Sequence, residues 1–311
     1  MKTRKILDQM ILVVMNITLW QGRKALQTGD LALNGIDVDK LPPGTLATLG
    51  SKRIISPDAV KIFVSLKREA LKYCLQYGVR FGGCGYAVPR EKVAVLSQEL
   101  KRIKGDFEAA KVQFLSVYHE EVERWVAANP PEWAPIIRAS VDSSRHIEKT
   151  ISFNYAALDV KPPDDVEADG LDDEVDSLYG QLCHEVRVAA RHTFENYLVG
   201  KREITHKTLR PIKLIREKLV GLLFLDPTIA ETIQVIEDTL QKLPEDTVIK
   251  GTDLNMVAGL VGRQLANMGR PVTAEPEHET DTTEEPPGDE LPAALITTQY
   301  TGAVASIIWD F

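Results

Sequence analysis

Residues 93–117 read VAVLSQELKRIKGDFEAAKVQFLSV, and this stretch decides the predicted fold class. Its apolar side chains alternate in steps of three and four residues, at Val93, Leu96, Leu100, Ile103, Phe107, Ala110, Phe114 and Val117. A spacing that averages three and a half residues puts them on one side of an α-helix, as in a coiled coil. Because no proline interrupts residues 90–129, we expect one long helix over residues 90–127, roughly 57 Å in length.

Apolar side chains at helical spacing recur towards the N-terminus. One stripe consists of Ile6, Met10, Val13, Ile17 and Trp20. Further on, Ser56-Pro57-Asp58 combines a hydroxyl cap, a proline at the first helical position and an acid in the first turn, and Gly78 is a typical stop. Both patterns predict helices. Residues 79–88 are the exception, where a short irregular β-like segment is expected.

The helical pattern continues beyond Pro130-Pro131. It predicts a helix from Pro135 to Leu158. Residues 159–176 hold nine acids and one lysine, which is typical of an exposed loop. The sequence thus predicts an all-α fold, an elongated bundle of about eight helices including long coiled-coil-like helices. It would have an N-terminal helical region with long antiparallel helices (residues 1–158) and a C-terminal helical region (residues 177–270).

Charge separates the body of the chain from its end. The net charge is −8, yet no lysine or arginine follows Arg270, whereas nine acids do. We expect a disordered acidic linker over residues 271–292 and a short apolar C-terminal segment over residues 293–311. This end resembles a tethered peptide for a groove or a sheet edge, with Trp309, Asp310 and Phe311 as partner-binding residues. The alternative is that residues 293–311 fold back onto the body of the chain.

The glycine-rich run Gly78–Pro89 has one feature of an anion site. Backbone N–H groups of a glycine-rich turn ahead of a helix can bind anions, and Arg80 would assist them. The run lacks the Lys-Ser/Thr pair of a P-loop and the spacing of a dinucleotide site. A tight turn that reverses the chain between two long helices is therefore the favoured interpretation.

Metal and nucleophile patterns are incomplete. His184, followed by a glutamate, begins a zinc-protease motif, but the next histidine is His192, two helical turns away instead of one. The cysteines Cys74, Cys84 and Cys183 supply no second pair for a zinc site. We therefore predict no catalytic residue, no metal, no cofactor and no enzymatic activity.

The segment from residue 201 to residue 218 is strongly basic, with seven bases against two acids. Its candidate contacts to an anion or a nucleic acid are Lys201, Arg202, Lys207, Arg210 and Lys213. No aromatic residues are interleaved with them for stacking on single strands. Ion pairing with residues 159–176, or with the acidic end of the chain, explains the segment equally well.

The composition favours a cytoplasmic protein. Three cysteines in a chain of 311 residues argue for a reducing compartment. The apolar run at residues 10–15 has polar neighbours and no small-residue cleavage site after it, so neither a signal peptide nor a membrane anchor is expected. The sequence leaves the oligomeric state open.

Three stretches together resemble a bacterial family: LWQGRK (residues 19–24), LPP through LGSKR (residues 41–53), and the run Gly78–Pro89. It is a domain-of-unknown-function family carried on plasmids, integrative elements and some phages, and the resemblance covers residues 5–225. The family has no assigned catalytic residues, so none carry over. Its genes tend to lie beside those of a MoxR/CobS-like AAA+ ATPase and a von Willebrand A-domain protein, and the resemblance implies these two partners.

The same resemblance implies a function in protein–protein contacts. The chain is expected to be a non-enzymatic adaptor or substrate component of that ATPase/A-domain module, encoded on a mobile genetic element. A von Willebrand A domain holds Mg²⁺ and leaves one position for a partner's carboxylate, which Asp310 or an acid of residues 159–176 would supply. The alternative is a nucleic-acid-binding accessory protein that uses residues 201–218. An enzyme built on Arg80 and a membrane-inserting protein are disfavoured.

Overall fold

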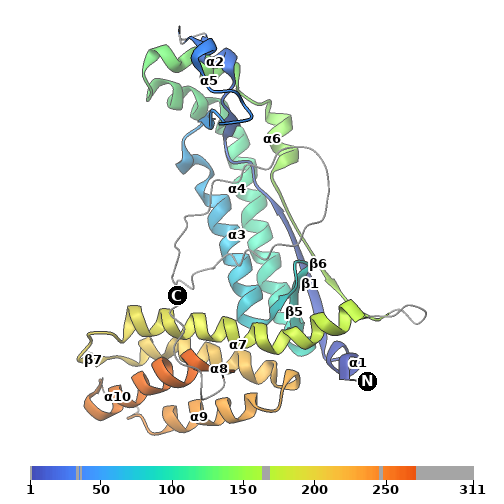
Figure 1. The fold of residues 1–311 in the computed structure, drawn as a ribbon, viewed down its shortest axis with the longest axis vertical. Coiled ribbons are helices and arrows are strands. Elements are labelled where there is room, and N and C mark those ends of the chain that lie inside the picture. Colours follow the sequence, from blue (N-terminus) through green and yellow to red (C-terminus); the bar gives the residue numbers. More distant parts are fainter. Residues whose placement is uncertain (1, 33–34, 36, 163–168, 245–247, 271–311) are drawn as a thin grey trace. The chain divides into compact units, whose positions relative to one another are not determined.

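The fold is mostly helical, but it also contains antiparallel sheets (Figure 1). The computed structural model describes residues 2–32, 35, 37–162, 169–244 and 248–270. In this part there are ten α-helices. The prediction of a predominantly helical chain is confirmed, whereas that of a purely all-α bundle is wrong.

The chain divides into two compact units. Unit 1 comprises Met1–Leu182 and Arg216–Ala230, and unit 2 comprises Cys183–Ile215 and Glu231–Phe311. The predicted helical regions, residues 1–158 and 177–270, lie on either side of the acidic segment 159–176. Each unit has its own buried core.

The predicted acidic segments have different outcomes. Within residues 159–176, residues 159–162 belong to no helix or strand and residues 163–168 lie outside the described residues. From Asp169 on, the predicted loop is wrong, because α7 (Asp169–Tyr197) begins there. The predicted linker, residues 271–292, and the apolar segment, residues 293–311, lie outside the described residues. Among the helices that are described, none combines the length and the apolar character required to cross a bilayer.

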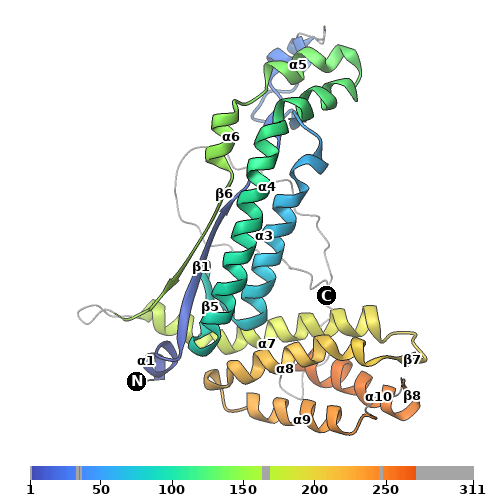
Figure 2. The ribbon, with the colours of Figure 1, turned by 180° about the vertical axis from the view of Figure 1, so that it is seen from behind.

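Two long helices form the centre of unit 1. α3 (Pro57–Tyr77) and α4 (Val93–Ala127) pack side by side (Figures 1 and 2). The buried side chains of α4 are Leu96, Leu100, Ile103, Phe107, Phe114, Tyr118, Val122 and Val126. The predicted long helix is thus confirmed. From Phe114 onward the buried positions step by four, so the heptad spacing of the first half is not kept to the end.

A four-stranded antiparallel sheet packs against these two helices. Its strands are β1 (Met10–Thr18), β4 (Val79–Phe81), β5 (Gly85–Pro89) and β6 (Ser152–Leu158). Their order in the sheet is β4-β5-β1-β6, so β6 is an edge strand. Each neighbouring pair is antiparallel.

The N-terminal segment contradicts the prediction of a helix over residues 6–20. Only α1 (Lys2–Leu7) is helical there, and the following residues form β1. Five of the nine residues in β1 are β-branched, which favours an extended backbone. Its first four residues are buried, and the strand lies between β5 and β6. The apolar spacing fits a helix as well as a strand, and the partner strands decide between them.

The predicted helix from Pro135 to Leu158 is interrupted. The structure has instead α5 (Ala134–Ala139), α6 (Ser144–Thr150) and β6. Ser143 begins α6 as a cap, since its hydroxyl accepts a hydrogen bond from a backbone N–H of the first turn. Phe153 then packs on Phe107 of α4, with 5.4 Å between the ring centroids. This burial favours a strand where the spacing alone indicates a helix.

The glycine-rich run forms the hairpin of β4 and β5, so its interpretation as a tight turn between two long helices is confirmed. Gly82, in the three-residue connection, has a φ of 49°, a conformation that favours glycine. Gly78 ends α3 close to β5: a Cβ at this position would lie 2.7 Å from the carbonyl oxygen of Ala87. Only glycine therefore fits at this point.

Two of the stretches that carry the family resemblance pair with each other. β2 (Arg23–Ala25) and β3 (Ser51–Arg53) form a short antiparallel ladder in unit 1. Between them in sequence lie α2 (Thr28–Ala32) and a 3₁₀ turn (Val38–Lys40).

Unit 2 is built mainly from helices. It contains the later part of α7 and parts of α8 (Arg210–Gly221) and α9 (Ile229–Gln241), together with α10 (Gly251–Gly259). β7 (Glu203–Ile204) and β8 (Ile249–Lys250) form a two-residue ladder. Gly262 packs directly under Phe194, because a Cβ there would lie 2.7 Å from a ring carbon.

Candidate functional site

The outer side of β6 has no neighbouring strand among the described residues (Figures 1 and 2). Hydrogen bonding shows which backbone groups face outward. In the register of β1 with β5, Gln9 lies opposite Arg90, and the N–H of Arg90 donates to the carbonyl of Gln9 (2.9 Å). Since hydrogen-bonded positions alternate along an antiparallel strand, the odd-numbered residues of β1 bond to β5 and the even-numbered ones bond to β6. By the register of β1 with β6, the even-numbered residues of β6 bond to β1. The outward-facing residues are therefore Phe153, Tyr155 and Ala157. Because Phe153 is buried, only Tyr155 and Ala157 have N–H and C=O groups that a partner can reach.

Side chains hold β6 firmly against α4. Phe153 is 1% exposed, and the Tyr155 hydroxyl donates to the carbonyl of Ser97 (3.4 Å). Just before the strand, the ammonium group of Lys111 donates to the carbonyl of Ile151 (2.7 Å). The edge is thus formed and fixed before any partner arrives, which lowers the entropic cost of binding.

The chemistry of this edge leaves it open to pairing. None of the seven residues of β6, SFNYAAL, is charged or a proline. Proteins usually protect an exposed edge with lysine, proline, a bulge or a covering segment. Ala156, Ala157 and Leu158 are exposed, Leu158 to 48%. An extended peptide can therefore add to β6 as a further strand through main-chain hydrogen bonds.

Asp142 is the centre of a polar cluster near the β2–β3 ladder. The indole N–H of Trp20 donates to its Oδ2 (3.0 Å), and Lys24 Nζ lies 2.8 Å from its Oδ1. The hydroxyl of Tyr118 donates to its backbone carbonyl (3.1 Å). Burial, together with the Asp142 carboxylate, raises the pKa of Tyr118 to about 12. These contacts fix the ladder to α4, and the cluster has a structural role.

Arg80, the predicted anion contact, is half-buried in β4 opposite Tyr86. The carboxylate of Glu174 lies over the adjoining turn, since a Cβ on Gly82 would be 2.9 Å from its Oε1. A negative charge at this place disfavours an anion on the turn. The geometry therefore gives the predicted anion site no support.

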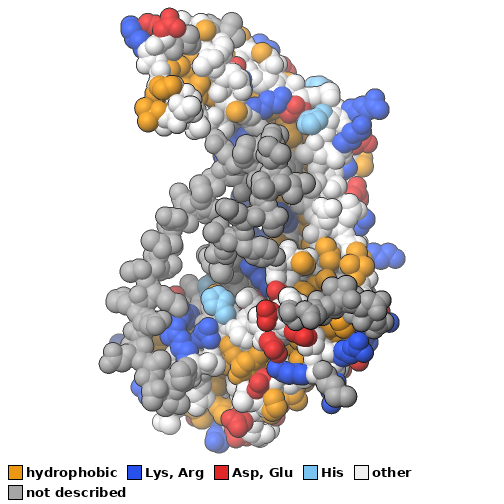
Figure 3. Space-filling view, turned by 45° about the vertical axis from the view of Figure 1, so that its right-hand side comes forward, with side chains coloured by type: hydrophobic (Ala, Val, Ile, Leu, Met, Phe, Trp, Pro, Cys, Tyr) orange, Lys and Arg blue, Asp and Glu red, His pale blue; other side chains and the backbone are white. Residues whose placement is uncertain are grey.

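The basic segment, residues 201–218, divides between the two units. The candidate contacts Lys201, Arg202, Lys207, Arg210 and Lys213 are exposed in unit 2, and none forms an ion pair with another described residue. By contrast, Arg216 is half-buried and Lys218 is 4% exposed. On the face seen in Figure 3, Lys and Arg side chains stand in small separate groups. The segment thus offers five accessible bases.

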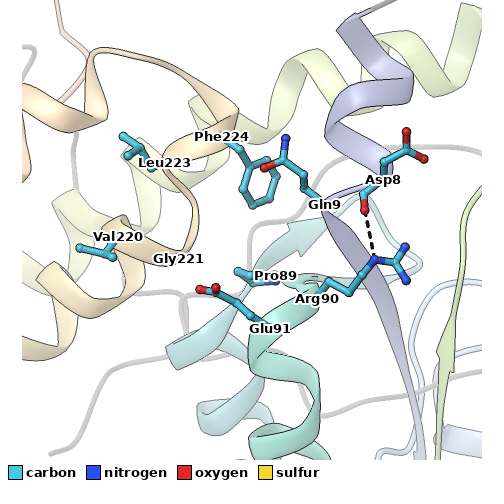
Figure 4. A pocket seen from close by; sticks show the side chains of 9 residues that line it. All are labelled: Asp8, Gln9, Pro89, Arg90, Glu91, Val220, Gly221, Leu223 and Phe224. Carbon is cyan, nitrogen blue, oxygen red and sulfur yellow. Dashed lines mark hydrogen bonds between the residues drawn. The ribbon is translucent and has the colours of Figure 1, made fainter.

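Unit 1 also contains an open groove of about 540 Å³ (Figure 4). It is lined by Asp8, Gln9, Pro89, Arg90, Glu91, Val220, Gly221, Leu223 and Phe224. The guanidinium of Arg90 is already bound, with Nε donating to the carbonyl of Asp8 (3.0 Å) and Nη2 to Asp159 (2.6 Å). Val220 and Leu223 form an exposed apolar wall. This groove has the character of a contact surface.

The remaining predicted residues add no further chemistry. Burial raises the pKa of the Cys74 thiol to about 12, which makes it a poor nucleophile. Within the described residues, no group of His, Cys, Asp and Glu side chains is arranged to hold a metal ion. Trp309, Asp310 and Phe311, the predicted partner-binding residues, lie outside the described part of the chain.

A protein-family model matches most of the chain. It covers residues 7–265 and is described as a protein of unknown function, DUF3150. No curated protein and no solved structure shows significant similarity to the chain.

Proposed function

Since the chain belongs to the DUF3150 family of unknown function, we propose that it is a non-enzymatic adaptor, or a substrate component, that acts through protein–protein contacts. The open edge of β6 is its main binding surface. A partner segment in extended conformation adds to this edge and forms hydrogen bonds with Tyr155 and Ala157.

One observation carries this proposal: β6 is a fixed, seven-residue edge strand without a charged residue or a proline. An edge of this kind is a hazard for aggregation unless something pairs with it. Phe153 packs into the core of unit 1 and leaves no room for a charge, but the exposed position of Ala156 could carry one. The absence of this protection favours a role for the edge.

The partners are those that the family resemblance implies, a MoxR/CobS-like AAA+ ATPase and a von Willebrand A-domain protein of a mobile genetic element, in the cytoplasm. An A domain would bind a carboxylate through Mg²⁺ in addition. Asp172 and Asp173, exposed in the first turns of α7, are described candidates for this carboxylate. Asp310 is the candidate at the end of the chain.

The test is co-purification with the von Willebrand A-domain protein that the family resemblance implies, with and without Mg²⁺. Ala157→Pro removes one outward N–H and leaves the bonds of β6 to β1 intact, whereas Ala157→Val keeps the N–H. We expect Ala157→Pro to weaken binding at least about tenfold, and Ala157→Val to bind as the unchanged chain does. Equal binding by both variants contradicts edge addition. If both variants bind normally and binding is lost only when Mg²⁺ is removed, the contact is made by the carboxylate instead.

The second candidate is a nucleic-acid-binding accessory protein. It is favoured by the five exposed bases of unit 2, which have no ion-pair partner among the described residues. Replacing Lys207, Arg210 and Lys213 by glutamine would then lower affinity for duplex DNA and reduce its salt dependence. Ala157→Pro would leave DNA binding unchanged, so the two functions can be distinguished.

A further inference from the structure

The β2–β3 ladder places two arginine side chains opposite each other. Its register pairs Arg23 with Arg53. The backbone N–H of Ile54 donates to the carbonyl of Gly22 (2.9 Å), so the adjacent positions 22 and 54 form the hydrogen-bonded pair. Arg23 and Arg53 are therefore a non-hydrogen-bonded pair, the kind in which facing side chains lie closest together.

The two lysines of the ladder point to its other face, and each has a fixed counter-charge. Lys24 Nζ lies 2.8 Å from Asp142 Oδ1, and Lys52 Nζ lies 2.5 Å from Asp30 Oδ2. Both carboxylates are largely shielded from solvent, with side chains 15% and 11% exposed. The lysine charges are thus already compensated inside unit 1.

The described residues give the two arginines no such compensation. In the part of the chain that the structure describes, no carboxylate lies within ion-pair distance of the Arg23 or the Arg53 guanidinium. Burial and the charge of Arg23 lower the pKa of Arg53. Like charges directly opposite each other destabilise a sheet. The ladder therefore contains a repulsion that a bound anion would relieve.

The backbone around the arginines is held rigidly. The indole N–H of Trp125 donates to the carbonyl of Arg53 (3.2 Å). The next two residues, Ile54 and Ile55, are 0% and 1% exposed. On the other strand, Gly22 has a φ of 66°, and a Cβ there would clash with the side chain of Ile55. The two guanidinium groups thus extend from a rigid backbone, as a preorganised site requires.

We propose that Arg23 and Arg53 bind a phosphate monoester group, a site that goes beyond the protein-binding function proposed above. Guanidinium groups bind phosphate oxygens in bidentate pairs. Two of them balance the charge of about −1.5 to −2 that a monoester carries at neutral pH, whereas a single carboxylate would leave one positive charge over. The neighbouring lysines are bound to carboxylates, so the site fits one phosphate and does not extend into a track for a nucleic-acid backbone.

Inorganic phosphate is the probe for this site. The midpoint of thermal unfolding of the full chain is measured in phosphate and in chloride at equal ionic strength, and the affinity is measured by calorimetric titration. We expect phosphate to raise the midpoint and to bind saturably. Arg53→Gln should weaken this binding at least about tenfold, because one pair of charged hydrogen bonds is lost.

A charge reversal separates binding from folding. Arg23→Glu puts a carboxylate opposite Arg53, so the variant should unfold in chloride at the same or a higher temperature, yet lose its response to phosphate. Arg145→Gln is the matched control. Arg145 is an exposed arginine of α6 in unit 1, without an ion pair in the described residues, and its loss should leave the response intact.

Two results would overturn the proposal. If phosphate stabilises the unchanged chain and Arg53→Gln equally, the site is not at this pair. If the dicarboxylate succinate stabilises the chain as much as phosphate does, the pair recognises carboxylates and the assignment to phosphate is wrong. Both measurements are made without a protein partner. Either result would therefore contradict the phosphate site alone and would not bear on the proposal that β6 binds a partner.

Discussion

The ammonium group of Lys218 donates a hydrogen bond to the carbonyl oxygen of Leu75, with a distance of 2.7 Å between the two atoms. Leu75 belongs to the last turn of α3, where carbonyl groups lack partners within the helix. A lysine that is 4% exposed thus binds the negative end of a helix in unit 1. Lys218, the last basic residue of the predicted nucleic-acid-binding segment (residues 201–218), therefore has a structural role in unit 1.

Replacing Lys218 by methionine should destabilise the protein. The aliphatic stem is kept, but the carbonyl of Leu75 loses a charged donor in a buried place. We expect the free energy of unfolding to fall by about 1–3 kcal/mol, measured by urea denaturation. Lys213→Met, at an exposed position of α8, is the matched control and should change little. Equal effects of the two substitutions would show that the buried hydrogen bond contributes nothing.

The Asp142 cluster predicts coupling between two side chains. Asp142→Asn weakens its contact with Lys24 and should lower the free energy of unfolding by about 1–3 kcal/mol. In a double-mutant cycle with Lys24→Met, the two losses should deviate from additivity by more than about 0.5 kcal/mol. Simple additivity would mean that the two side chains do not interact in solution.

The register of β6 predicts opposite results for two neighbouring alanines. Ala156→Pro removes an N–H that bonds to β1 and leaves the accepting carbonyl without a donor, so it should cost about 1–3 kcal/mol of unfolding free energy. Ala157→Pro removes an N–H on the outer side and should cost far less. Chemical denaturation of both variants measures the difference. A larger loss for Ala157→Pro would show that the inward and outward residues are assigned the wrong way round.

Asp30 predicts a dependence of stability on pH. The hydrogen bond from Lys52, together with one from the backbone N–H of Gln27, lowers the pKa of this carboxyl despite its burial. A lowered pKa in the folded state stabilises the protein above the unfolded pKa, and this contribution disappears as the pH falls through the folded pKa. The difference in unfolding free energy between the unchanged chain and Asp30→Asn should therefore shrink between about pH 5 and pH 3. A constant difference would argue against the ion pair.

The sequence predicts the helices of this fold better than its strands. α3 and α4 are long, and their apolar spacing, together with the Ser56 cap of α3, leaves no other structure to compete. β1 and β6 are stabilised by each other, although more than 130 positions separate Thr18 from Ser152. A local pattern contains no information about such a partner, and the apolar residues of both strands also fit a helical stripe.

The candidate sites show the same limit. The exposure of Lys201 follows directly from a basic segment, but the burial of Lys218 in that same segment does not. The opposition of Arg23 and Arg53 depends on strand pairing, which spacing along the chain does not reveal. Their presence in two stretches that carry the family resemblance was the available signal.

The most direct measurement of the central claim is residue-resolved amide exchange of β6, followed by NMR with and without the A-domain partner. Without partner, the amides of Asn154 and Ala156 should already be protected by β1, while those of Tyr155 and Ala157 exchange faster. Addition of the partner should slow the exchange of these two outward amides. If the partner binds and the two amides exchange at an unchanged rate, this chain does not act through the edge of β6.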